Sequence, residues 1–130
     1  PPYSSAASDV YKRQGEGVLL YLMVMERENL MEFCENICTP LEIPVIAGVF
    51  LLKSYKNALF INKYVPGANI PENIINRLKN AKDPLQEGIQ IAAEQAKDFI
   101  NIADGVHLMA VKAEHLIPEI LKKAELTLEY

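Results

Sequence analysis

Two cysteines and one histidine are the side chains of this sequence best suited to metal binding or catalysis. Cys34 and Cys38 stand four residues apart in a helical pattern, a spacing that places two thiols on one helix face. Thiolates are soft metal ligands, but no further Cys or His stands at ligand spacing beside them. We therefore expect two small apolar residues on a buried helix face, in a reducing compartment.

His107 lies in the middle of an apolar segment. At such a position we expect a packed, hydrogen-bonded core histidine rather than a catalytic one. The sequence has no Ser/His/Asp or Cys/His arrangement, no phosphate-binding loop and no dinucleotide-binding glycine fingerprint. Nucleophilic catalysis and a nucleotide-binding fold of that kind are therefore not indicated.

Three apolar runs are typical of strands buried on both faces, as in a parallel sheet: residues 18–24, 45–52 and 105–111. Amphipathic segments between and after them predict helices over residues 27–37, 55–64, 71–80, about 84–102 and 114–124. Strands that alternate with helices predict an α/β fold with right-handed crossovers. Three strands form neither a full doubly wound sheet nor a closed barrel, so we expect the last part of a larger domain.

Local signals predict where two helices begin and which residues of the helical segments are buried. Ser54 and Asp83 are expected N-caps. The apolar spacing predicts that Ile37 and Leu59 are buried. Asn62 stands where the apolar stripe that starts at Tyr55 would favour an apolar side chain.

Composition limits the partners. The net charge is −4 and the sequence has no basic block, which argues against nucleic-acid binding. Half of the residues are hydrophobic, enough for a core, but no apolar run is long enough to span a bilayer and no secretory signal is visible. We expect a cytoplasmic protein without nucleic-acid or membrane partners and without a metal.

Residues 4–14, SSAASDVYKRQ, match the translation of a transposase sequencing adapter at every position. We therefore expect residues 1–14 to be a non-native, adapter-derived segment, and residues 15–130 to be the natural part of the chain.

The ordered set of remaining segments resembles the methylenetetrahydrofolate reductase family. Residues 44–58, PVIAGVFLLKSYKNA, are similar to its seventh strand and the helix that follows, and residues 105–111, GVHLMAV, to its last barrel strand. Residues 65–71, VPGANIP, are similar to the stretch that opens a short helix, and residues 83–88 and 117–121 resemble its compact, single-domain members. The similarity covers about Val18 to Leu121.

This resemblance implies an eight-stranded (β/α)8 TIM barrel that carries FAD. The chain would be its truncated C-terminal part, about strands 6–8. The family reduces 5,10-methylenetetrahydrofolate to 5-methyltetrahydrofolate, with hydride supplied by NAD(P)H or another electron donor through the flavin. A folate substrate is thus implied, and a homo-oligomer of the full-length protein is compatible. Most flavin contacts would come from earlier strands, so we expect the fragment itself to be inactive.

The same resemblance implies three substrate-binding residues. Asn57 stands where the family often carries a glutamine that hydrogen-bonds substrate, and Ile61 stands at an aromatic position of that pocket, with an ordinary core isoleucine as the alternative. Lys112 aligns with a family arginine once one residue is skipped, and could pair with the glutamate tail of the folate. Catalytic and cofactor-binding residues are not identified by the resemblance.

One departure from the family leaves other interpretations open. Tyr21-Leu22 stand where the family carries Thr-Gln, whose glutamine contacts the pterin, so either substrate recognition differs or residues 15–22 are also junction sequence. A non-catalytic barrel relative that acts as a partner subunit is one alternative. The reductase half of a bifunctional homocysteine S-methyltransferase/methylenetetrahydrofolate reductase is another.

Overall fold

The computed structural model describes residues 20–23 and 26–126. Residues 1–14, the expected adapter-derived segment, lie outside this part of the chain, and so do the side chains of Tyr21 and Leu22. The strands are β1 (Leu20–Met23), β2 (Val45–Phe50) and β3 (Gly105–Met109). The helices are α2 (Arg27–Phe33), the π-helical turn η1 (Cys34–Cys38), α3 (Thr39–Leu41), α4 (Tyr55–Tyr64), α5 (Glu72–Asn80), α6 (Pro84–Phe99), the 3₁₀ turn η2 (Glu114–Leu116) and α7 (Ile117–Lys123).

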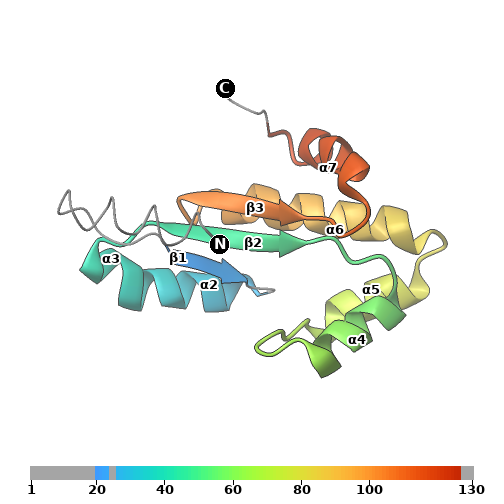
Figure 1. The fold of residues 1–130 in the computed structure, drawn as a ribbon, viewed down its shortest axis with the longest axis horizontal. Helices are drawn as coiled ribbons and strands as arrows, with labels where there is room; N and C mark the ends of the chain where they lie inside the picture. The colour runs from blue at the N-terminus through green and yellow to red at the C-terminus, as the bar shows by residue number, and fades with distance from the viewer. Residues whose placement is uncertain (1–19, 24–25, 127–130) are drawn as a thin grey trace.

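The described strands form one parallel sheet in the order β1-β2-β3. A parallel pair needs a long crossover, and helices occupy the chain between each pair of strands. Because the strands run in one direction, their carboxyl ends meet at one edge of the sheet, next to α4 and α5 (Figure 1). The expected α/β arrangement with parallel strands is confirmed.

The first helical segment differs from the expectation. It continues beyond residue 37 through η1 and α3 to Leu41, with Pro40 in the first turn of α3. The turn η1 is π-helical, and its wider turn rotates the side chains that follow it. As a result Cys38 is 3% exposed and Ile37 is 43% exposed. The prediction that Ile37 is buried is therefore wrong.

Helix α4 begins and ends where the sequence predicts. The Ser54 side chain accepts a hydrogen bond from the Asn57 backbone N–H at 3.1 Å, as an N-cap does. Its buried residues are Ala58 and Ile61. Leu59 is 47% exposed, against the prediction, because it lies about 100° around the helix from Ala58.

The polar residue in the middle of α4 has a structural role. Asn62 Oδ1 accepts from the backbone N–H of Ile70 at 2.7 Å, and Asn62 Nδ2 donates to the Ile70 carbonyl at 3.2 Å. These two hydrogen bonds close the connection between α4 and α5. The connection itself turns at Gly67, whose φ of 81° is accessible to glycine at little cost.

Helix α6 has the expected Asp83 N-cap, whose side chain accepts from the Gln86 backbone N–H at 3.2 Å. The helix ends at Phe99, three residues before the expected end, and a turn leads into β3. Helix α7 follows η2 and has Pro118 in its first turn, as the sequence indicates.

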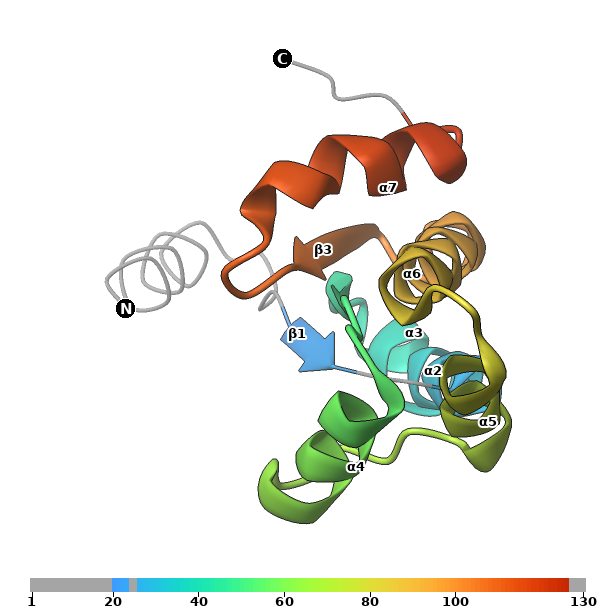
Figure 2. The same cartoon turned by 90° about the vertical axis from the view of Figure 1, so that its right-hand side faces the viewer.

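Two hydrophobic clusters hold the elements together. The first joins Ala47 and Val49 of β2 to Leu30 of α2, Phe99 of α6 and Ile120 of α7. Helices α2 and α6 accordingly lie on the same side of the sheet (Figure 2). The second lies at the carboxyl end of β2 and joins it to α4, α5 and α6; its buried members are Leu52, Ala58, Ile61, Ile70, Ile74, Leu78 and Ile91.

Strand β3 lies at one edge of the described sheet, and its residues are less buried than those of β2. Val106 and Leu108 pack against the first cluster, whereas His107, which alternation places on the opposite face, is exposed. The expectation of a packed core histidine is therefore wrong, because the helices of that cluster cover the other face of the strand.

Within residues 20–23 and 26–126, no helix has the length and the apolar character that a bilayer span requires.

Arg77 ties α5 to α6 through two carboxylates. Its guanidinium donates to the two oxygens of Glu94 at 2.7 and 3.0 Å and to Glu87 Oε2 at 2.8 Å. The hydrogen bonds from Arg77 lower the pKa of the Glu94 carboxyl. A lowered carboxyl pKa means that this contribution to stability is complete above the unfolded-state pKa and is lost as the pH falls through the folded-state pKa.

Replacing Arg77 by methionine is expected to lower the free energy of unfolding by about 1 kcal/mol at pH 7, because solvent screens partners that are partly exposed. The loss should be smaller at pH 3, where Glu94 is closer to neutral. Urea unfolding of both proteins at the two pH values measures it. An equal loss at both would show that the arginine stem, and not the ion pair, stabilises the fold.

Candidate functional site

The carboxyl ends of β2 and β3 are joined by a backbone hydrogen bond beyond the strands. The Leu51 N–H donates to the Met109 carbonyl at 2.8 Å. Polar residues follow directly on both sides: Lys53 and Ser54 after β2, and Lys112 after β3. Ligands of open parallel α/β sheets bind at this edge, so these side chains form the candidate site.

Asn57 is held in place by the cap of α4. Its backbone N–H donates to Ser54 Oγ, and its own Oδ1 accepts from the Lys53 backbone N–H at 3.2 Å. The side-chain hydrogen bonds found among the described residues use its Oδ1 and not its Nδ2 group. The half-buried Asn57 side chain therefore presents an amide donor at the strand ends.

Lys112 adopts a left-handed backbone conformation, with a φ of 57°. Such a conformation costs a residue other than glycine of the order of 1 kcal/mol and is found disproportionately at binding sites. Its backbone N–H donates to Glu114 Oε1 at 3.2 Å, which ties the exposed Lys112 to the start of η2.

The side chain of Lys53 connects the two halves of the site. Its ammonium donates to the carbonyl of Val111, the residue before Lys112. The structure thus brings the surroundings of Asn57 and Lys112 together through Lys53, although 55 positions separate the two predicted residues along the chain. The position of Lys53 directly after the apolar run 45–52 already places it near the strand ends in the sequence, but the resemblance gives it no binding role.

Ile61 lies apart from this polar group. It is 4% exposed and belongs to the second hydrophobic cluster, beside Ala58. Its contacts are those of a core residue, and its part in substrate binding stays a prediction.

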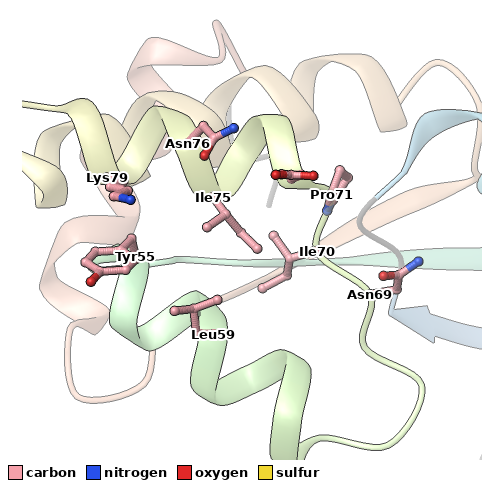
Figure 3. Close-up of a pocket in the computed structure, with 9 residues that line it drawn as sticks. Tyr55, Leu59, Asn69, Ile70, Pro71, Ile75, Asn76 and Lys79 are labelled. Atoms are coloured by element: carbon pink, nitrogen blue, oxygen red, sulfur yellow. The ribbon is translucent and has the colours of Figure 1, made fainter.

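A groove of about 490 Å³ lies between α4 and α5 (Figure 3). Leu59, Ile70 and Ile75 form its apolar centre, which accounts for the exposure of Leu59. At one end the Lys79 ammonium lies 5.9 Å from the centroid of the Tyr55 ring. None of the residues Lys53, Asn57 and Lys112 lines this groove, so it is separate from the strand-end site.

The two cysteines lie at the opposite edge of the sheet, where β2 begins. They line a cleft of about 340 Å³ with Val45 and Asp104, and both thiols are free. Burial raises the pKa of both thiols, and the nearby Asp104 carboxylate raises it further. Among the described residues no three His, Cys, Asp or Glu side chains are grouped so that they could hold a metal ion.

Comparison with known proteins identifies the family of the chain. A family model described as methylenetetrahydrofolate reductase matches residues 15–125 of the chain. The match includes all the described strands and the residues Lys53, Asn57 and Lys112. It leaves residues 1–14 outside. No curated protein matches the chain significantly.

Proposed function

This chain belongs to the methylenetetrahydrofolate reductase family, and from that premise we propose that it supplies the folate side of the active site of a flavin-dependent reductase. The single observation that carries the proposal is the family match over residues 15–125. The reaction is the reduction of 5,10-methylenetetrahydrofolate to 5-methyltetrahydrofolate.

The architecture supports a place in a barrel. Parallel strands that follow one another in chain order, with helices packed on one face, are what successive units of a (β/α)8 barrel require. We propose that β1, β2 and β3 are about strands 6–8 of such a barrel. The carboxyl ends of barrel strands carry the active site, and Lys53, Asn57 and Lys112 lie there.

Asn57 and Lys112 have complementary roles in this proposal. Because Asn57 Oδ1 already accepts from the Lys53 N–H, its Nδ2 group is the atom that donates to an acceptor of the substrate. The ammonium of Lys112 pairs with a carboxylate of the glutamate tail, as a point charge without the bidentate geometry of an arginine.

Once reduced by its electron donor, bound FAD would supply the hydride. The polar side chains at the described strand ends are two lysines and one amide. We propose that these groups contact the folate and that most flavin contacts come from earlier strands of the barrel. We propose that the chain by itself does not catalyse the reduction. We also propose that it acts in the cytoplasm, in keeping with its free thiols.

Replacing Asn57 by aspartate tests the role of the amide. Aspartate keeps an oxygen that accepts from the Lys53 N–H and suits the N-terminal end of a helix, so stability should change by less than about 0.5 kcal/mol. The lost donor should weaken binding of 5-methyltetrahydrofolate about tenfold. Titration of the chain, followed in ¹H–¹⁵N spectra, measures this affinity. As a control, Lys56→Met, on the exposed side of α4, leaves both the Ser54 cap and the amide donor in place.

Equal affinities of wild type and Asn57→Asp would contradict the assigned role. If the wild-type chain shows no folate-dependent shifts near Asn57, a non-catalytic relative becomes the better account, and Tyr21-Leu22 in place of the family's Thr-Gln favours it. Sequencing outward from the coding region of residues 23–121 provides the second test. Five further strand–helix units upstream would support the reductase, whereas a genomic copy of residues 4–14 at this place would refute the adapter origin.

A further inference from the structure

Lys53 makes contacts that a solvated surface lysine does not need. Its backbone N–H donates to Asn57 Oδ1, and its side chain crosses from the end of β2 to the Val111 carbonyl after β3. The residue as a whole is half-buried, while the ammonium and its bond to Val111 are exposed. Holding a lysine in one extended arrangement costs rotamer entropy, so this arrangement needs a compensating interaction.

The partner of the Lys53 ammonium is a neutral carbonyl. An ammonium has three N–H donors, so two remain for another acceptor, and the full positive charge is retained. The ion pairs within the described residues use Arg27, Arg77 and Lys97 as their cations, and none includes Lys53. On a chain with a net charge of −4, a lysine that is held at the strand ends without a carboxylate partner among the described residues leaves a positive charge that attracts anions.

The neighbouring charges indicate where that anion lies. The Glu114 carboxylate accepts a hydrogen bond from the backbone N–H of Lys112 and thus lies at the Lys112 loop. Within the part of the chain that the structure describes, it forms no ion pair with Lys53. The Lys53 ammonium lies at the Val111 carbonyl of this loop, while the Lys53 backbone N–H bonds Asn57 at the cap of α4. An elongated ligand with a polar group at Asn57 and an anionic end would therefore reach Lys53 as well.

We propose that Lys53 is a second cation of the folate site, which binds a carboxylate of the glutamate tail and, through Val111, positions the loop that carries Lys112. The proposal rests on the proposed function for the identity of the ligand. Its chemistry, an anionic oxygen bound by an ammonium, would also suit the diphosphate of a nucleotide cofactor, and the experiment separates the two.

The probes are tri-γ-glutamate, which carries the tail alone, ADP, which carries a diphosphate alone, and 5-methyltetrahydrofolate. Each is titrated into the full chain at low ionic strength and followed in ¹H–¹⁵N spectra. We expect tri-γ-glutamate to shift the amides of Lys53, Asn57 and Lys112. Lys53→Met should weaken its binding at least about tenfold, because one charge-assisted hydrogen bond is lost. Lys53→Arg, which keeps the charge and the donors, should restore most of the affinity.

Lys56→Met is the matched control, since Lys56 lies on the exposed face of α4, away from the hydrogen bonds of the strand ends. It should bind tri-γ-glutamate like the wild type. Spectra of Lys53→Met without ligand report the positioning role, which predicts shifts confined to the loop around Val111 and the cap of α4. If Lys53→Met does not fold, Lys53→Gln, which keeps a donor without the charge, takes its place.

Unchanged tri-γ-glutamate binding in the folded Lys53 variant would overturn the proposal, and so would binding of ADP alone. If tri-γ-glutamate binds in a Lys53-dependent manner but 5-methyltetrahydrofolate does not bind, the anion site stands and the proposed function fails. If the folate binds and does not respond to Lys53→Met, the proposed function stands and the role of Lys53 fails.

Discussion

Gly88→Ala is expected to destabilise the fold by at least about 3 kcal/mol, although alanine is the better helix former. A Cβ atom at Gly88 would lie 1.7 Å from the Leu52 carbonyl oxygen and 2.9 Å from its carbon. Both are backbone atoms, so no side-chain rotation relieves the clash. The gain in helix propensity is about 1 kcal/mol and cannot offset a displacement of α6 from the end of β2. Urea unfolding of both proteins measures the difference.

Gly67→Ala is the matched control. A Cβ atom there meets nothing within 4 Å, and the cost is that of a φ of 81°, about 1 kcal/mol. Equal losses in the two variants would show that α6 does not pack as closely on Leu52 as described. Because Lys53 follows Leu52, Gly88→Ala should also disturb the strand-end site, whereas Gly67→Ala should leave it unchanged.

Asn62→Leu is expected to lower the free energy of unfolding by about 2–4 kcal/mol. The two hydrogen bonds from the Asn62 side chain satisfy the N–H and the carbonyl of Ile70, which is 2% exposed. Leucine leaves both backbone groups without their partner, and the cost of an unsatisfied buried group exceeds the gain from a larger apolar side chain. Thermal and urea unfolding are the measurements.

The apolar stripe of α4 predicts instead that Asn62→Leu raises the free energy of unfolding, since leucine at position 62 would complete the stripe. A neutral or stabilising effect of Asn62→Leu would therefore support the stripe and contradict the hydrogen-bonded connection. Asn76→Ala, on the exposed side of α5, serves as the control and should change stability by less than about 0.5 kcal/mol.

The sequence by itself determined the features that depend on neighbours along the chain. The Ser54 and Asp83 caps, the bounds of α4 and the three apolar strands follow from a few adjacent residues, because capping and periodicity are local. The resemblance of ordered segments gave the family, which the match over residues 15–125 confirms. The barrel and the substrate-binding residues stay predictions.

Only the tertiary structure decided features that depend on residues distant in sequence. The π-helical turn left Ile37 exposed beside the buried Cys38, and the groove beside α5 left Leu59 exposed. The contact of Lys53 with Val111 joins segments 58 residues apart, and no spacing along the chain encodes it. Local patterns fix which residues form a helix or a strand, whereas the contacts of a side chain depend on how those elements pack, and the candidate site is a product of that packing.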